Sequence, residues 1–335
     1  MRLVTFTRLE GGEDRIGAFI DGDANIVDLD RAYATVHGET LNGETVKMFA
    51  SMMALIESGG AGQTAAQTLV DVAPVEAVIA ANTVRLRSPL PRPRQMRDFM
   101  AFEGHARGAR EVHFMKSAAQ KKNPAAAMAE YRRRGQLDPP PVWYDQPVYF
   151  KCNRLSVIGP AEDILYPSFT HELDYELELA FVTGRKGRNI ARDDASDYIF
   201  GYTIFNDVSA RDAQINEMRG QLGPAKGKDF DTGNILGPCI VTADEIGDAY
   251  DLDMRARLNS ELLSQGNSGD IFHTFEAMIE HVSRDETIWP GEVFGSGTIG
   301  GGSGHEHYRL MEIGDEIELE VEKIGVLRNK VVAGV

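Results

Sequence analysis

The sequence predicts a mainly β protein with a small N-terminal α+β domain. Short strand patterns fill most of the chain after residue 147, and a Pro-rich connector, "SPLPRPRQ", begins at Ser88. Both strand and helix patterns precede that connector. A chain of 335 residues is long enough for about two domains. We therefore expect a β-rich N-terminal domain at 1–88 and a larger domain at 89–335.

Alternating apolar residues predict three strands in the N-terminal domain, at 2–8, 15–21 and 25–33. The turn after the second strand begins like a calcium loop with Asp21 and Asp23, but it lacks the required Gly and Glu, so a plain hairpin is favoured. Helical periodicity over 44–59 predicts a helix that ends at Gly59 and Gly60.

After the connector, helix-like spacing of apolar residues covers 96–114. The segment at about 112–145 is rich in Ala, Lys, Arg and Pro and lacks strand alternation, so a helix-bearing lid or insertion is expected there. One further helix is predicted at 271–285. Strand patterns recur at 147–153, 157–167, 174–184, 198–207, 234–246, 252–266 and 316–332.

The composition excludes several classes of protein. Lys and Arg number 35 against 51 Asp and Glu, a net charge of −16, which argues against a nucleic-acid partner. No apolar run approaches the roughly 20 residues of a membrane span, and the first residues lack a signal-peptide pattern, so a cytoplasmic location is expected. Cys152 and Cys239 have no CxxC spacing and are expected to be buried thiols.

The stretch "DYELELAFVT" carries acids at alternate positions of a predicted strand. Side chains alternate faces along a strand, so Asp174, Glu176 and Glu178 point the same way. Like charges in a row repel unless water screens them or a cation lies between them. An edge strand with a solvated acidic face and a metal site both fit this stretch.

Other candidate residues are ambiguous one by one. Asp207 ends a predicted strand, where turn formers are also common. The run "GSGTIG" from Gly295 is followed by more glycines and not by a helix, so it is no dinucleotide fingerprint, although its backbone and Thr298 can approach an anion. His105 lies beside Glu103 on an amphipathic segment, where a structural or exposed role is the ordinary one.

Taken in order, the motifs "DYELEL", "NDVSARDAQ", "KDFDT", "LGP" and "GSGTI", with a histidine upstream, resemble the fumarylacetoacetate hydrolase family over roughly residues 90–330. The resemblance implies a mixed β-roll or sandwich for the catalytic domain. It also implies a homodimer. Side chains that contact the variable end of the substrate are expected in the segment around 112–145.

The resemblance also implies a set of site residues. Glu176, Glu178 and Asp207 would be metal carboxylates, and Asp98 a fourth ligand. His105 would be the general base, with Lys228 holding the departing enolate. Gln214 and Thr298 match substrate-side positions, and Thr232 a secondary cation contact. Compact relatives carry a Glu where this chain has Gly108, so the carboxylate that orients His105 is open among Glu103, Glu111 and Glu312; Glu312 stands where the founding enzyme has its partner.

The implied function is a metal-dependent hydrolase that cleaves the C–C bond of an acylpyruvate or another 1,3-diketo acid in the catabolism of aromatic or related compounds. Hard oxygen ligands suit magnesium, and also manganese or calcium, better than zinc. One alternative is a decarboxylase, isomerase, hydratase or dehydratase acting on a 2-oxo acid. A second is a non-catalytic ligand-binding protein on the same fold.

Overall fold

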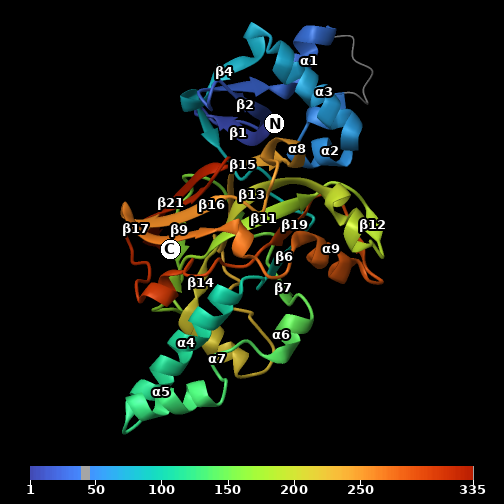
Figure 1. Cartoon of the computed structure of the whole chain (residues 1–335). Helices are drawn as coiled ribbons and strands as arrows, with labels where there is room; N and C mark the ends of the chain where they lie inside the picture. The colour runs from blue at the N-terminus through green and yellow to red at the C-terminus, as the bar shows by residue number, and fades with distance from the viewer. Residues whose placement is uncertain (39–45, 335) are drawn as a thin grey trace.

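A computed structural model describes residues 1–38 and 46–334 (Figure 1). Its centre is a large β-sheet packed against a smaller one, with helices on two sides. The strands pair mostly antiparallel, but β6 (Gln95–Phe99) runs parallel to β19 (Glu292–Gly295) and β8 (Val157–Ile158) runs parallel to β15 (Asn234–Thr242). The prediction of a mainly β, mixed fold with helices is therefore confirmed.

The large sheet unites both parts of the chain. Its other strands are β1 (Arg2–Arg8), β2 (Arg15–Ile20), β3 (Asn25–Asp28), β4 (Val78–Ala80), β5 (Val84–Leu86), β7 (Tyr149–Lys151), β11 (Leu177–Thr183) and β13 (Ile199–Asp207). They run in the order β4–β3–β2–β1–β15–β13–β11–β19–β6–β7, with β5 beside β1 and β8 beside β15. Because β1 pairs with β15, the N-terminal strands continue the central sheet. The domain division at residue 88 stays a prediction.

The smaller sheet closes one face of the large one. Its order is β17–β16–β20–β21–β9, with β9 (Ile164–Tyr166), β16 (Asp253–Leu258), β17 (Glu261–Asn267), β20 (Glu316–Val321) and β21 (Gly325–Ala333). Alternation along β11 divides the core: Leu177 and Phe181 pack with residues of the smaller sheet, whereas Ala180 and Val182 pack with the N-terminal helices. Strand β11 is thus buried on both faces.

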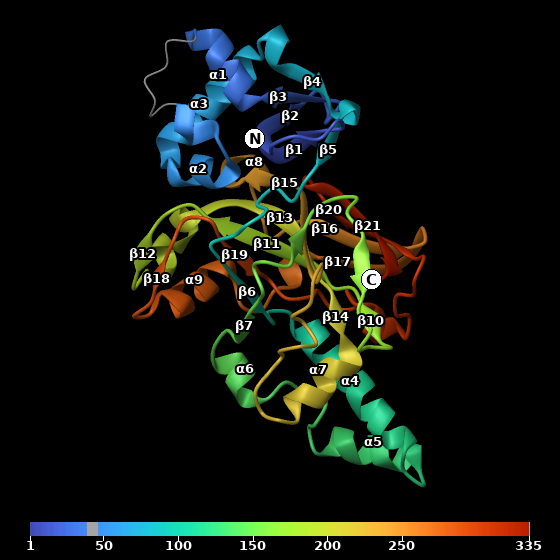
Figure 2. The same cartoon turned by 180° about the vertical axis from the view of Figure 1, so that it is seen from behind.

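Helices lie on opposite sides of the sheets. The N-terminal group is α1 (Leu29–His37), α2 (Met52–Glu57) and α3 (Gly59–Val72), and the others are α4 (Glu103–Ala119), α5 (Pro124–Arg133), α6 (Pro141–Asp145), α7 (Arg211–Met218), α8 (Ala243–Ile246) and α9 (Phe275–Ser283). Figures 1 and 2 both show α4 to α7 on the side of the sheets opposite to α1, α2 and α3. The two-residue strands β10 (Leu173–Asp174) and β14 (Ser209–Ala210) form a ladder near α4 and α7.

Several element boundaries differ from the sequence predictions, among them the following three. The strand predicted at 25–33 ends at Asp28, because the Asp28 carboxylate accepts the N–H of Arg31 and caps α1. Within the helix predicted over 44–59, the structure has a 3₁₀ turn at Val46–Phe49 and then α2, and Gly59 begins α3. Residues 44–45 of that prediction lie outside the described residues. The helix predicted over 96–114 begins only at Glu103, because the first residues pair with β19 as β6.

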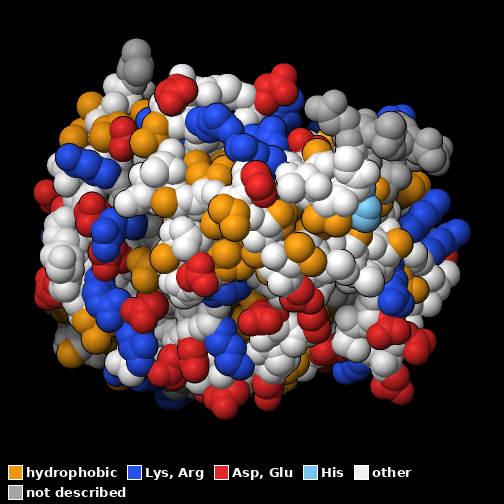
Figure 3. Space-filling model, turned by 90° about the horizontal axis from the view of Figure 1, so that it is seen from above, with side chains coloured by type: hydrophobic (Ala, Val, Ile, Leu, Met, Phe, Trp, Pro, Cys, Tyr) orange, Lys and Arg blue, Asp and Glu red, His pale blue; other side chains and the backbone are white. Residues whose placement is uncertain are grey.

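Other expectations from the composition can be checked directly. Cys152 and Cys239 are buried free thiols, as predicted. Across residues 1–38 and 46–334, no helix has the length and apolar character that crossing a membrane requires. Basic and acidic side chains are interspersed on the face shown in Figure 3. That face has no broad basic surface of the kind that nucleic-acid binding requires.

Candidate active site

The acidic stretch identified in the sequence is buried and is not a solvated edge. Asp174, Glu176 and Glu178 are all buried, and β11 has neighbours on both sides, β13 and β19. The chain breaks its strand between β10 and β11, and there the backbone N–H of Glu176 donates to Asn206 Oδ1 (3.0 Å). Three buried carboxylates need cationic or hydrogen-bonding partners, and the edge-strand interpretation is excluded.

Three neighbouring regions of the large sheet bring carboxylates together. One oxygen each from Asp98 on β6, Glu178 on β11 and Asp207 at the end of β13 lie within 4.8 Å of one another. Gly295 on β19 lies between them, and a Cβ there would come to 2.5 Å from Asp98 Oδ1 and 2.8 Å from Glu178 Oε2. The absence of a side chain at Gly295 is what allows the two carboxylates to approach.

This acidic triad, defined as Asp98, Glu178 and Asp207, fits a hard divalent cation. Oδ1 of Asp98 and Oδ1 of Asp207 are buried and have no hydrogen-bond partner. Burial and the neighbouring carboxylates raise the pKa of Asp98 and of Glu178 well above the usual range. Burial also raises the pKa of Asp207, to about 6, although Lys228 opposes the rise. Unpaired buried carboxylate oxygens are ligands that Mg²⁺, Mn²⁺ and Ca²⁺ accept.

Glu176, the predicted metal ligand that is not part of the triad, borders it and is held by cationic side chains. Its Oε1 accepts from Arg211 Nη2 (2.7 Å), and its Oε2 contacts Lys228 Nζ. Burial alone would raise the pKa of Glu176, but Arg211 and Lys228 lower it below the usual range. The same Lys228 ammonium lies 2.5 Å from Asp207 Oδ2. Lys228 therefore joins Glu176 to the triad.

His105 lies in the first turn of α4 and faces this cluster. Its Nδ1 is 2.8 Å from Glu306 Oε2, and its Nε2 is 3.5 Å from Glu176 Oε1. Burial raises the pKa of Glu306, but the contact with His105 outweighs it and lowers that pKa. An ionised carboxylate only accepts, so the Nδ1–H of His105 donates to Glu306. The Nε2 atom is left to face the carboxylates.

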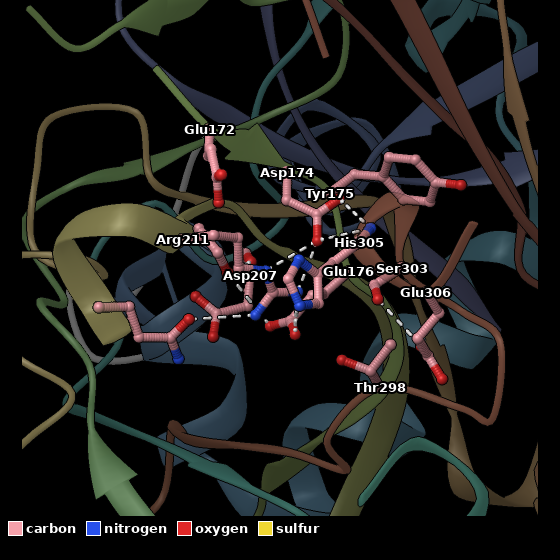
Figure 4. Close-up of polar contacts among 12 residues, drawn as sticks. Glu172, Asp174, Tyr175, Glu176, Asp207, Arg211, Thr298, Ser303, His305 and Glu306 are labelled. Atoms are coloured by element: carbon pink, nitrogen blue, oxygen red, sulfur yellow. Dashed lines mark hydrogen bonds and ion pairs between the residues drawn. The ribbon is translucent and has the colours of Figure 1, made fainter. Parts of the chain in front are cut away.

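The prediction that Glu312 orients His105 is wrong, and the partner is Glu306. Glu312 is exposed, and its backbone N–H donates to Asp315. After the glycine-rich run, the chain makes a 3₁₀ turn at Gly304–His307, which carries Glu306 back to α4. Ser303 Oγ (2.9 Å) and the N–H of Gly301 (3.1 Å) hold its carboxylate there; Figure 4 shows the Ser303 contact.

The two other open candidates for orienting His105 have different partners. Glu103 accepts hydrogen bonds from Arg107 and Tyr144 at the surface. Glu111 accepts from Arg132 of α5. Neither carboxylate has a described contact with His105.

Gly108 explains how the carboxylate of Glu306 reaches His105. A Cβ at Gly108 would lie 2.3 Å from Glu306 Oε1, so the glycine leaves the space that this carboxylate fills. We expect Gly108→Ala to lower kcat at least tenfold by moving Glu306 away from His105. The melting temperature should change by only a few degrees, because Ala favours the helix by up to about 1 kcal/mol and Glu306 can rotate aside. Steady-state kinetics and a thermal melt check both; unchanged kcat would contradict this role of Gly108.

The remaining predicted residues divide into two groups. Gln214, Lys228 and Thr298 line the same cavity as His105; Thr298 Oγ1 donates to Glu178 Oε1 (3.3 Å) and Gln214 Oε1 accepts from Arg211 (3.1 Å). Thr232 does not join them. Its hydroxyl accepts the N–H of Leu165 (2.9 Å) in β9, and the secondary cation contact expected at Thr232 stays a prediction.

Sequence reasoning missed the groups that surround Glu176. Arg211 is buried and donates through Nε to Asp174 Oδ2 (2.8 Å) as well as to Glu176, and Asp174 also accepts the backbone N–H of His305 (3.1 Å) (Figure 4). The His305 imidazole is buried and lines the cavity. Burial and Arg211 lower the pKa of His305 to about 3, so the ring is neutral. The only signal in the sequence was "GHEH" directly after the glycine run.

Asp98 and Asp174 are both buried, but only Asp174 is paired with a described cationic side chain, so the two provide a matched test. In the metal-free protein, Asp98→Asn removes one of three mutually repelling charges, so we expect a higher melting temperature and a smaller shift on adding Mg²⁺. Asp174→Asn leaves Arg211 without one of its two carboxylates. We expect the free energy of unfolding to fall by about 3–5 kcal/mol, and the melting temperature to fall with it. Thermal melts with EDTA and with MgCl₂ measure both. Equal destabilisation by the two variants would contradict the assignment.

A cavity of about 700 Å³ opens from this cluster. Its inner end holds Asp98, Glu176, Glu178 and His105. Its outer walls come from α4, α7 and the segment at 139–143, within the predicted lid. The inner end can thus bind a cation and an anionic ligand beside a histidine whose Nε2 faces Glu176. The outer walls can enclose the rest of the ligand.

The family assignment follows from comparison with known proteins. A family model described as "Fumarylacetoacetate (FAA) hydrolase C-terminal" matches residues 116–332. The chain belongs to the fumarylacetoacetate hydrolase family. The matched region contains Glu176, Glu178 and Asp207, while Asp98 and His105 precede it.

Known members of the fumarylacetoacetate hydrolase family resemble this chain to different extents. The mitochondrial oxaloacetate tautomerase fahd2 of Xenopus laevis is 39% identical over 188 residues, which are 56% of this chain and 58% of that protein. The fumarylacetoacetate hydrolase of Exiguobacterium antarcticum is 26% identical, with a TM-score of 0.72 over 99% of both chains. A structure of maleylpyruvate hydrolase from Sphingobium sp. SYK-6 with manganese(II) and pyruvate shares the fold, at 23% identity and a TM-score of 0.69 over the whole of both chains.

Proposed function

We propose that this protein is a divalent-cation-dependent hydrolase that cleaves the C–C bond of an acylpyruvate or another 1,3-diketo acid. The observation that carries the proposal is the His105–Glu306 contact of 2.8 Å beside the acidic triad. A histidine whose Nδ1–H is held by a carboxylate presents Nε2 as a base, which is what activation of water requires. Asp98, Glu178 and Asp207 would hold the cation, with Glu176 beside them, and magnesium is the first candidate.

The residues of the site can be given roles in this reaction. A bound cation would polarise the 2-oxo acid and stabilise enolate charge. His105 Nε2 takes a proton from water, and the water oxygen bonds to the acyl carbonyl carbon. The C–C bond then breaks, its electron pair stays on the pyruvate carbon, and protonation there gives pyruvate and a carboxylic acid. Lys228 and Gln214 would bind the oxygens of the substrate, and Glu306 stabilises the imidazolium.

The decisive experiment follows the enol absorbance of a panel of acylpyruvates with MgCl₂, with product analysis, before and after excess EDTA. Loss of absorbance that yields pyruvate and one carboxylic acid, and that EDTA stops, is the expected result. Decay at the same rate in EDTA, or an unchanged acylpyruvate in MgCl₂, would contradict the proposal. The expected cytoplasmic location and homodimer remain predictions that this assay does not address.

A second candidate is tautomerisation of oxaloacetate, since relatives 36–39% identical to this chain are named oxaloacetate tautomerases. His105 would then move a proton to and from carbon 3 with no attack by water. The same assay separates the two reactions: oxaloacetate enol would decay to the keto form with its carbon skeleton intact. The carboxylate behind His105 would stabilise the imidazolium that forms in either reaction, so the products decide between the two candidates.

A further inference from the structure

The outer part of the cavity is unlike the inner end in chemistry. Three large apolar side chains lie exposed along it: Met100, Val142 and Met218 are 39, 48 and 54% exposed. They come from three separate places, after β6, in α6 and at the end of α7. Exposed apolar residues scattered singly are ordinary, but several that line one cavity mark a surface that a ligand covers.

The wall that carries Val142 is fixed in place by its neighbour. Trp143 is buried, its Nε1–H donates to the carbonyl of Met100 (2.7 Å), and its own carbonyl is 2.5 Å from His273 Nε2. Its ring also packs against Phe272. These contacts tie α6 to Met100, so this wall of the outer compartment is in place before a ligand enters.

The size of the cavity bears on the size of the ligand. Cavities of about 300–1,000 Å³ enclose drug-sized ligands, and this one measures about 700 Å³. A four-carbon oxo diacid would fill only the end beside the triad. The outer compartment is also the part of the site formed by the segment predicted to contact the variable end of the substrate.

We propose that the outer compartment binds an apolar acyl group, alkyl or aryl, so that the preferred substrates are 2-oxo acids with an extended apolar substituent. Met100, Val142 and Met218 would determine this specificity. The inference rests on the proposed function for one point only, that the 2-oxo acid end lies at the triad. Arg110 also lines the cavity, but its Nε and Nη2 both donate to the carbonyl of Gln136. Arg110 is therefore already bound to the lid segment.

Binding of 2-oxo acids that cannot be hydrolysed tests the inference without turnover. Titration calorimetry with MgCl₂ compares 2-oxobutanoate with 2-oxo-4-phenylbutanoate, neither of which has the 4-oxo group. We expect the phenyl compound to bind about tenfold to a hundredfold more tightly. Val142→Ser and Met218→Ser should lower this ratio severalfold and leave 2-oxobutanoate unaffected. Val75→Ser, at an exposed valine of the N-terminal part, is the matched control.

Each other outcome has one meaning. Equal affinity for the two compounds would overturn the inference and leave the proposed function intact, whereas binding of neither would contradict the proposed function and the inference with it. Tighter binding of 2-oxoadipate than of the phenyl compound would overturn the inference, because it would show that the outer wall binds an anionic group through Arg110 and Arg219, which both line the cavity. A change of oligomeric state in Val142→Ser or Met218→Ser, seen by size-exclusion chromatography, would instead show that a second copy of the chain covers these residues.

Discussion

Replacing His105 by alanine is expected to lower kcat/KM for a cleavable acylpyruvate by about 10²- to 10⁴-fold, the usual contribution of a general base. The imidazole is buried, held at Nδ1 by Glu306 and directed at the carboxylate cluster through Nε2. Affinity for Mg²⁺ should change little, since none of the triad oxygens belongs to this residue. Stopped-flow decay of the enol absorbance gives the rate, and calorimetric titration with MgCl₂ gives the affinity. Full turnover by His105→Ala would remove the assignment.

A carboxylate swap separates the charge behind His105 from its position in the chain. Glu306→Ala alone should lower kcat about as much as Glu306→Gln, because both remove the charge that holds Nδ1–H. In the double variant Gly108→Glu with Glu306→Ala, the carboxylate comes from α4 into the space that Glu306 vacates. Recovery of at least tenfold over Glu306→Ala is the expected result. No recovery in a folded double variant would mean that Glu306 acts through Ser303 and Gly301 as well.

Removal of one triad carboxylate is the other large effect. We expect Glu178→Gln to lower kcat/KM by at least about 10³-fold, since Lewis-acid stabilisation of an enolate contributes several kcal/mol and each 1.36 kcal/mol is tenfold in rate. Mg²⁺ should also stabilise the wild-type protein. At a Mg²⁺ concentration 100 times Kd, the free energy of unfolding should rise by about 2.7 kcal/mol, which raises the melting temperature. In Glu178→Gln this gain should be lost.

The matched control is Glu320→Gln, which removes a carboxylate paired with Arg257 on the smaller sheet. It should retain both activity and the Mg²⁺ shift. For the wild-type protein, EDTA should abolish turnover and excess MgCl₂ should restore it. Activity of Glu178→Gln at the wild-type level in EDTA would rule out a role for a cation at this place.

The strands that carry the triad were predictable because their patterns are local. The apolar composition of β13 and β15 predicts buried strands, and "DYELEL" places Glu178 among apolar neighbours. The pairing of β1 with β15 was not predictable, because the sequence of neither strand indicates that it pairs with a strand about 240 residues away. The start of α3 at Gly59 was missed for a related reason: glycine ends many helices, and only tertiary packing of α3 lets it begin one.

Within the site, the sequence pointed to residues on strands, in the first turn of α4 and, for Lys228 and Thr298, on irregular backbone, but not to Glu306 or Arg211. Glu306 reaches His105 through a 3₁₀ turn whose existence depends on Ser303 and on the glycines before it. Residue spacing alone could not distinguish that turn from an extended loop that delivers Glu312. The burial of Arg211 could not be predicted from the sequence, because it depends on Asp174 and Glu176 lying across from α7.

A divalent cation at the triad would compete with a positive charge that is already there, the ammonium of Lys228. This ammonium neutralises Asp207, a member of the triad, and Glu176, which borders it. A cation bound at the triad would therefore compete with Lys228 for Asp207, and its measured affinity would be the difference between two attractions. A modest Kd for magnesium would then be compatible with a well-formed ligand set. The displaced ammonium would be released at the cavity wall, where an anionic substrate can take it up as its counter-ion.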